Sequence, residues 1–159
     1  MRLIKTVCLF IICFLVVSCK NVVMYRSYHH MPSAGWSKGD TLLFDLSVND
    51  SITNDSTPGH YNMELLVRNR TDYRYQHLSL FVQHNFPDTT VWKTDTMRFV
   101  IADKNGQWQG KGISGLYELS KPLAEADLSR PHHFTLKVVS LMNDSILLGL
   151  NDIGVIAYK

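Results

Sequence analysis

The sequence predicts an all-β protein: an antiparallel β-sandwich of immunoglobulin-like or jelly-roll type, with at most one short helix. Short segments in which apolar and polar residues alternate recur along the chain after residue 36. Stretches rich in Asp, Asn, Gly and Pro separate these segments at roughly regular intervals. A short helix can be placed in only one stretch. Together these features favour two packed antiparallel sheets over a barrel, and they leave the strand order open.

The first five expected strands carry their apolar residues at every second position, so that these residues share one face of a sheet. The expected strands cover residues 41–48, 61–69, 77–83, 95–101, 134–139, 146–150 and 153–158. The last two are rich in β-branched residues, and Asn151-Asp152 between them has the composition of a turn. The apolar residues 22–25 are expected to form a first or edge strand.

Turn signals and one helix signal complete the local prediction. Residues 50–59 are polar and form an expected loop, and Asn105-Gly106 is a strong signal for the tight turn of a hairpin. We expect Trp108 to cover an edge of the core. Three nearby glycines are expected to permit bulges or close backbone approach: Gly110, Gly112 and Gly115. The helix is expected over Lys121–Leu128, with Pro122 at its first position.

The first 18 residues have the features of a bacterial lipoprotein signal peptide. Arg2 and Lys5 precede an apolar run of eleven residues from Val7 to Val17, which is too short to span a bilayer. The run ends in Val-Val-Ser before Cys19, the pattern at which such proteins are cleaved and acylated with fatty chains such as palmitate. We therefore expect residues 1–18 to be removed and residues 19–159 to form a single domain, attached to a membrane through lipid on Cys19.

Charge and cysteine content exclude several classes of protein. The whole chain has 16 basic and 14 acidic residues, so removal of Arg2 and Lys5 leaves a body near neutrality. Such a body has no electrostatic basis for binding nucleic acid. Cys8 and Cys13 lie in the signal peptide and Cys19 carries the lipid, so no disulfide is expected in the mature chain.

No motif in the sequence predicts catalysis, a metal or a cofactor. The chain lacks the spacing of a serine hydrolase, a zinc protease or a phosphate-binding loop. The pairs His29-His30 and His132-His133 could suggest zinc, but neighbouring residues of a strand point to opposite faces. We therefore expect a protein that is not an enzyme, holds no cofactor and takes no small-molecule substrate.

Arginine and tyrosine gather on the expected connection after residue 67. These residue types are enriched where proteins bind one another. The expected partner surface consists of Arg68, Arg70, Tyr73, Arg74, Tyr75 and Trp108. The alternative is a carbohydrate-binding lipoprotein of an envelope uptake system, in which Trp36, Trp92 and Trp108 would form a platform for sugar rings.

Residues 67–75, 101–112 and 152–155 follow in this order after the signal that ends at Cys19. This ordered set of segments resembles the GldH gliding-motility lipoprotein family of the Bacteroidota. The resemblance implies a component of the gliding machinery that is also linked to type IX secretion, sits in the outer membrane and lacks catalytic activity. Lys20 is not the Asp that retains some lipoproteins in the inner membrane, and no acidic cluster associated with surface display follows it. We therefore expect the domain to face the periplasm, with other envelope proteins as its partners.

A recurrent Asp-Ser/Thr pattern also resembles O-glycosylation sites of exported Bacteroidota proteins. On this basis Ser51, Thr96 and Ser145 are candidate glycosylation sites. An Asp before a β-branched strand start explains the same pattern without sugar.

Overall fold

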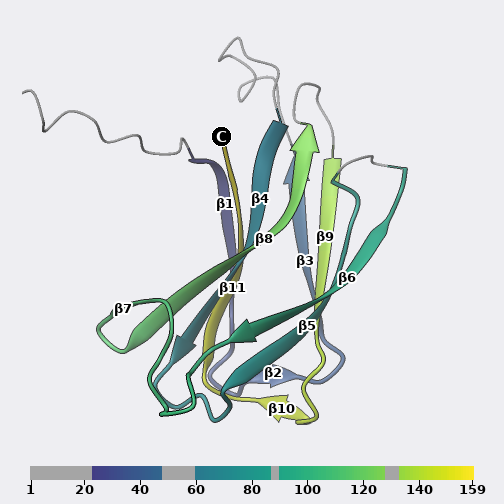
Figure 1. Cartoon of the computed structure of the whole chain (residues 1–159). Helices are drawn as coiled ribbons and strands as arrows, with labels where there is room; N and C mark the ends of the chain where they lie inside the picture. The colour runs from purple at the N-terminus through teal and green to yellow at the C-terminus, as the bar shows by residue number, and fades with distance from the viewer. Residues whose placement is uncertain (1–22, 48–59, 87–89, 128–132) are drawn as a thin grey trace, which may run out of the picture.

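The computed structural model describes residues 23–47, 60–86, 90–127 and 133–159, which form eleven strands and no helix. Two antiparallel sheets pack face to face (Figure 1). The five-stranded sheet has the order β1-β11-β4-β8-β7, and the four-stranded sheet has the order β3-β9-β5-β6. Strands β2 and β10 form a separate small pair. The predicted antiparallel β-sandwich is therefore confirmed.

The strands have the following bounds: β1 Val23–His30, β2 Trp36–Ser37, β3 Thr41–Ser47, β4 His60–Arg70, β5 His77–His84, β6 Lys93–Val100, β7 Lys111–Ile113, β8 Leu116–Asp127, β9 His133–Ser140, β10 Ile146–Leu147 and β11 Leu150–Tyr158. The predicted strands at 41–48, 61–69, 77–83, 95–101 and 134–139 correspond to β3, β4, β5, β6 and β9. The predicted edge strand near residues 22–25 is β1, which lies at one edge of the five-stranded sheet.

The core lies between the two sheets and follows the alternation seen in the sequence. In β5 every second side chain is buried, and Leu78, Leu80 and Val82 are fully enclosed. From the opposite sheet, Val67 of β4 and Val155 of β11 are equally enclosed. Because β5 contributes one face to this core, its other face is free to carry polar side chains.

The helix predicted for Lys121–Leu128 is wrong, since residues 121–127 belong to the long strand β8. β8 pairs with β4 along its whole length, from Leu116 opposite Arg70 to Asp127 opposite His60. Pairing with a distant strand overrides the helical preference of alanine and glutamate in this stretch. Pro122 lies where the register between the two strands shifts, a position at which a residue without an N–H group is tolerated.

The turn predicted at Asn151-Asp152 is also wrong. β11 continues without a break from Leu150 to Tyr158, and Asn151 falls at a register shift against β4. The chain turns earlier, at Gly149, whose φ of 85° favours glycine. A polar pair within a β-branched segment thus marks an irregularity of the strand instead of its end.

The turn predicted at Asn105-Gly106 is confirmed. Ala102 and Trp108 form a β-bridge, and the Asp103 carboxylate accepts hydrogen bonds from the backbone N–H groups of Asn105 and Gln107. Gly106 has a φ of 79°. The close approach predicted for the later glycines is also found, since a Cβ on Gly110 would lie 2.2 Å from the carbonyl oxygen of Glu118.

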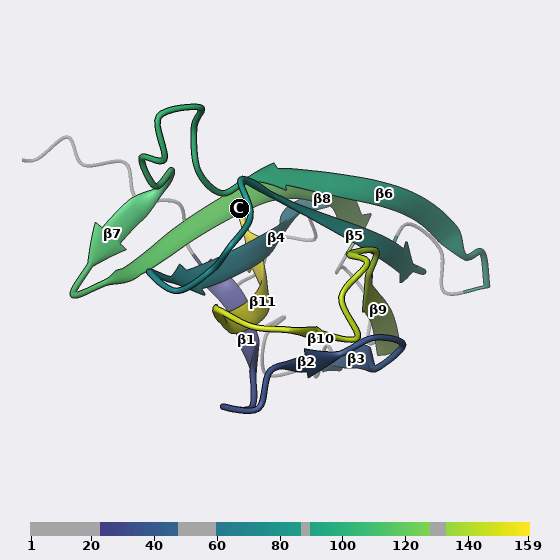
Figure 2. The ribbon, with the colours of Figure 1, turned by 90° about the horizontal axis from the view of Figure 1, so that it is seen from below.

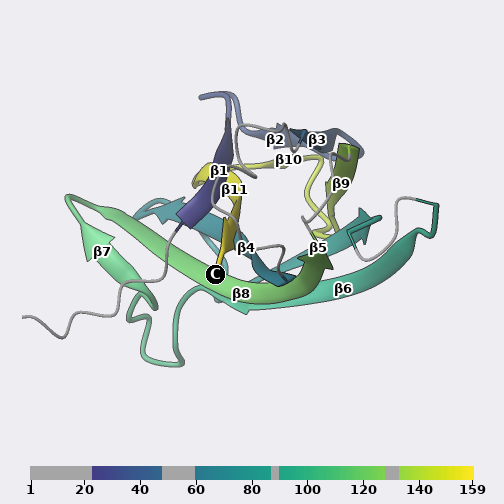
Figure 3. The ribbon, with the colours of Figure 1, turned by 90° about the horizontal axis from the view of Figure 1, so that it is seen from above.

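The described chain begins and ends at the same end of the sandwich, whereas β2 and β10 form the opposite end (Figure 1). We call the end with β2 and β10 the distal end, and Figure 2 shows it from below. In Figure 3, seen from above, β7 lies at the rim of the molecule. The signal peptide, Cys19 and the 50–59 loop lie outside the described residues. The described part of the chain contains no helix that is long and apolar enough to cross a bilayer.

Candidate functional site: two surfaces of the sandwich

A row of charged residues crosses the outer face of the five-stranded sheet. Pairing of the strands places His30 of β1 opposite Asp152 of β11, Asp152 opposite Arg68 of β4, and Arg68 opposite Glu118 of β8. Lys111 of β7 is in turn opposite Glu118. We call these five residues the charge row. Basic and acidic side chains alternate along it, which is the favourable order for cross-strand neighbours.

Arg68 is the centre of the charge row. Its Nε donates to Glu118 Oε2 at 2.6 Å, and its Nη2 donates to the Tyr28 hydroxyl at 3.1 Å. Its Nη1 lies 3.6 Å from Asp152 Oδ2, and the guanidinium stands 4.2 Å from the centre of the Tyr28 ring. The Asp152 side chain is only 9% exposed and also lies 2.9 Å from His30 Nδ1. The ion pairs are therefore shielded at Asp152 and open to solvent toward His30.

Tyr28 of β1 covers the middle of the charge row. Its hydroxyl donates to Glu118 Oε2 at 3.1 Å, and burial followed by the charge of Glu118 raises the pKa of Tyr28. The ring lies over Gly154, where a Cβ would approach Tyr28 Cδ1 to 2.4 Å. Glycine within this strand therefore makes room for the ring. Of these residues, Arg68 was predicted from the sequence as a partner residue, and Gly154 within an otherwise β-branched segment was the available signal for Tyr28.

The second surface is at the distal end. Tyr75 donates from its hydroxyl to Asp144 Oδ1 at 2.6 Å, which joins the connection after β4 to the connection after β9. Four exposed hydrophobic side chains belong to these connections, to β10 and to the connection after β10: Tyr75, Leu141, Ile146 and Leu148. We call these four residues the distal patch. Ile146 and Leu148 lie over Gly35, because a Cβ on that glycine would meet both side chains within 3 Å.

The structure separates the six residues that were predicted to form one partner surface. Arg68 is in the charge row, whereas Arg70 pairs with Asp72 at 3.0 Å, and this hydrogen bond lowers the pKa of Asp72. Arg74 is exposed, and Tyr75 belongs to the distal patch. Arg70, Arg74 and Tyr75 thus lie near the distal end, and Arg74 and Tyr75 are exposed.

Tyr73 and Trp108 have structural positions. Tyr73 is 4% exposed, and its hydroxyl donates to the backbone carbonyl of His77 at 2.9 Å. Burial raises the pKa of Tyr73, which keeps the phenol neutral. Trp108 is half-buried, and its ring centre lies 5.7 Å from that of Tyr117. Tyr73 is therefore not an accessible partner residue, and Trp108 covers an edge of the core as expected.

The tryptophans are in different environments. Trp36 is in the core at 2% exposure and donates to the backbone carbonyl of Asp40, whereas Trp92 is exposed beside the Lys137 ammonium. Trp36 is thus unavailable to a sugar ring. Among the described residues, no group of three or more His, Cys, Asp or Glu side chains is arranged to hold a metal ion.

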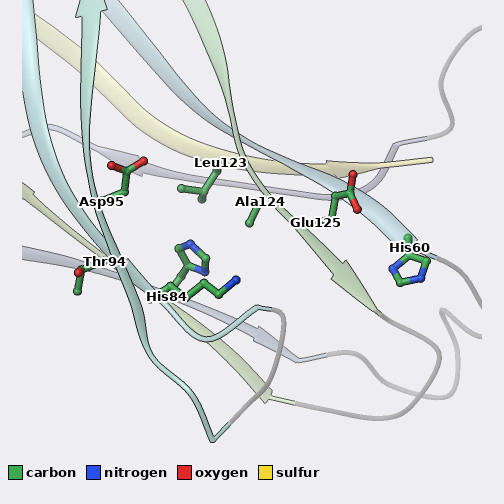
Figure 4. A pocket seen from close by; sticks show the side chains of 8 residues that line it. His60, His84, Thr94, Asp95, Leu123, Ala124 and Glu125 are labelled. Carbon is green, nitrogen blue, oxygen red and sulfur yellow. The ribbon is translucent and has the colours of Figure 1, made fainter.

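A cleft of about 590 Å³ opens between the sheets at the end away from the distal patch (Figure 4). It lies between the first residues of β6 and the later part of β8, with His84 on its floor. His84 is 4% exposed, its ring stacks on Phe86, and burial followed by the charge of Lys93 lowers its pKa. The acidic side chains of Asp95 and Glu125 do not converge on the histidine, so the cleft has no arrangement typical of acid-base catalysis.

Comparison with known proteins identifies the family. A family model described as GldH lipoprotein matches residues 23–156, which include both surfaces and nearly the whole described chain. The chain belongs to the GldH lipoprotein family. A family member from Christiangramia forsetii, named "Gliding motility lipoprotein GldH homolog", is 28% identical over 145 residues, covering 86% of this chain and 84% of that protein.

Membership of the GldH lipoprotein family confirms the resemblance found in the sequence. It makes the chain a gliding-motility lipoprotein, a class that is anchored to a membrane. Among solved structures, the chain is similar to the VP2 subviral particle of infectious bursal disease virus, with 11% identity and a TM-score of 0.32. That similarity covers 87% of this chain but only 31% of the viral chain.

Two of the three candidate glycosylation sites lie in the described part of the chain. Thr96 in β6 and Ser145 before β10 are both exposed. The backbone N–H of Thr96 bonds to the side chain of Asp95 at 2.6 Å, so this Asp has a local structural role. Ser51 and the lipidation site Cys19 lie outside the described residues. Glycosylation remains a prediction at all three sites.

Proposed function

We propose that this GldH-family protein is a non-enzymatic component of the gliding motility and type IX secretion machinery, and that it acts through contacts with other envelope proteins. Lipid on Cys19 would hold it in the outer membrane with the domain facing the periplasm. Family membership supports the link to motility. The association with secretion and the membrane assignment rest on the resemblance and on the residues around Cys19.

The distal patch is the observation that carries this proposal. Four exposed hydrophobic residues gather at one end, and tyrosine is a residue type enriched at protein interfaces. Cys19 lies four residues before Val23, which allows a span of about 13 Å between lipid and fold. β1 then runs about 25 Å further from the membrane at 3.3 Å per residue. The patch would therefore face away from the lipid, where a neighbouring envelope protein can reach it.

The test introduces a charge into the distal patch in the native host. Ile146 is 53% exposed, so Ile146→Asp removes an apolar contact with a partner at little cost to folding. We expect gliding or type IX secretion to be lost while the amount of the lipoprotein and its melting temperature stay near wild type. Spreading of colonies, export of secreted proteins and crosslinking to envelope proteins measure the effect.

The matched control is Leu43→Asp. Leu43 is 54% exposed and lies on β3, within the four-stranded sheet and outside the distal patch. This control should leave gliding and secretion intact. If Ile146→Asp and Leu43→Asp behave alike, the distal patch is not the partner surface.

A further inference from the structure

Strand edges are the starting point, because an unpaired edge can accept a strand from another protein. The free edge of β3 is joined by side chains to β1 of the other sheet. His29 Nε2 lies 2.6 Å from the carbonyl oxygen of Leu43, and the Tyr25 hydroxyl donates to the carbonyl oxygen of Asp45 at 3.5 Å. A strand arriving at β3 would have to displace these contacts.

The edges of β6 and of the later part of β8 are also protected. The Lys121 ammonium donates to the carbonyl oxygen of Arg98 at 2.5 Å, and the N–H of Thr96 donates to the Asp95 side chain. Pro122 gives β8 a residue without an N–H group in the stretch that β7 does not cover. Proline and lysine at edges are the means by which proteins prevent strand addition.

β7 differs from these edges. It pairs with β8 through a two-residue turn in which Ser114 and Gly115 have φ values of 49° and 82°, typical of a type I′ hairpin. Ile113 and Leu116 flank this turn and form the hydrogen-bonded pair, so the N–H and C=O of Gly112 point away from β8. Within the described chain, no side chain bonds to the backbone of β7, and Figure 3 shows it at the rim.

The side chains beside Gly112 define what this edge can bind. Lys111 and Ile113 lie on the outer face, and Ile113 is 78% exposed. Glu118, the cross-strand neighbour of Lys111, is engaged by Arg68 and Tyr28, and no carboxylate of the described residues forms an ion pair with Lys111. On the same face is a hollow of about 440 Å³, lined in part by Lys111, Ile113 and Arg68. A cation and an aliphatic side chain thus stand two residues apart, without partners of their own, beside a space for side chains.

We propose that the free edge of β7 accepts an extended segment of a partner protein, which hydrogen-bonds to Gly112 and carries a carboxylate beside Lys111 and an aliphatic side chain beside Ile113. The partner segment therefore has an acidic residue, any residue opposite Gly112, and an aliphatic residue in sequence. This inference deepens the proposed function, since it rests on a protein that works by contact with other proteins.

The test uses the mature lipoprotein in detergent micelles and a blocked peptide of sequence Thr-Asp-Thr-Val-Thr-Asp-Thr, which reads the same in both directions. It therefore presents the required pattern whether it binds parallel or antiparallel. A second peptide has lysine in place of both aspartates. A third keeps the aspartates but has N-methyl groups on valine and on the two threonines that flank it, which removes the N–H groups that would face Gly112 in either direction.

We expect the acidic peptide to slow hydrogen exchange of the Gly112 N–H and to bind about 2- to 5-fold more tightly than the lysine peptide, the ratio expected for one cross-strand ion pair. The Lys111→Glu variant should reverse this preference. The N-methylated peptide should not bind to either protein. The comparison of the three peptides uses the wild-type protein, so misfolding of a variant cannot produce the difference in binding between them.

Equal binding of the acidic and basic peptides, or unchanged exchange at Gly112 with several millimolar peptide, overturns the proposal. Concentration-dependent dimers that protect Gly112 without peptide also overturn it, because the edge would then belong to a second copy of the chain. The assay uses purified protein, whereas the test of the distal patch uses cells. Failure of one is therefore distinguishable from failure of the other.

Discussion

Asp152 of β11 joins three neighbouring strands through one carboxylate. This carboxylate is nearly buried and lies between Arg68 of β4 and His30 of β1, which compensate its charge. A buried charge that loses its partner is costly, whereas an exposed ion pair contributes little. The contribution of the charge row to stability therefore depends on Asp152, and removal of Arg68 should reveal this dependence.

Arg68→Met should lower the free energy of unfolding by about 1–3 kcal/mol, because it leaves Asp152 without its main cationic neighbour and Tyr28 without a donor. The Asp152→Asn substitution should cost less in the Arg68→Met background than in the wild type, since the uncompensated charge has gone. Urea unfolding of the four proteins measures both effects. Equal costs of Asp152→Asn in the two backgrounds would show that the residues act independently.

His84 should make stability depend on pH. Burial lowers its pKa in the folded protein, whereas an unfolded histidine titrates near 6.5. Below about pH 6.5 the unfolded state therefore binds more protons than the folded state, and the free energy of unfolding decreases as the pH falls. We expect the melting temperature to fall less between pH 7.5 and 5.5 in His84→Asn than in the wild type. Parallel curves for the two proteins would contradict a contribution from His84.

Among the strands, the structure shows which ones have a conformation that their own residues determine. Alternation identified β3, β4, β5, β6 and β9, because each has one face in the core. β8 was mistaken for a helix in part, since its conformation depends on pairing with β4, which begins more than fifty residues earlier. For the same reason the charge row could not be predicted, because its members come from five strands whose order only the folded sheet fixes.

β11 offers a test of close packing between neighbouring strands. In Gly154→Ala the added methyl group would meet the Tyr28 ring at 2.4 Å and the carbonyl oxygen of Ser27 at 2.9 Å. We expect a loss of about 1–3 kcal/mol in the free energy of unfolding, typical of overpacking. Thermal or urea unfolding measures it. The same substitution in a Tyr28→Ala background should cost less, because the ring no longer obstructs the methyl group, and an undiminished cost would assign the effect to the backbone contact alone.

Across the sandwich as a whole, the described termini and the distal patch lie at opposite ends. Val23 and Lys159 lie toward one end, and β2 and β10 lie at the other (Figure 1). The sequence predicted the sandwich and the residues of the expected lipid attachment. It did not predict that Tyr73 is buried while Ile146 and Leu148 are exposed, since both outcomes follow from how the connections fold over the open end of the core.

Cys19→Ser should abolish lipid attachment, since the thiol is the acceptor of the diacylglyceryl group in the expected pathway. Labelled palmitate should no longer enter the protein, and the protein should leave the membrane fraction, because several fatty chains each contribute about 0.8 kcal/mol per buried CH₂. Cys13→Ser is the matched control, since that residue lies in the expected signal peptide and its loss should change neither readout. Unaltered labelling of Cys19→Ser would place the lipid elsewhere.

The direction of β1 has a mechanical consequence. This strand runs from the end near the proposed lipid to the distal end and pairs with β11 over nearly its full length. If the membrane holds Val23 while a partner pulls on the distal patch, the load acts along the strand. The hydrogen bonds between β1 and β11 then resist in shear, all at once, instead of opening one after another as in a zipper. A domain held in this way resists unravelling when it is pulled between its first strand and the distal patch.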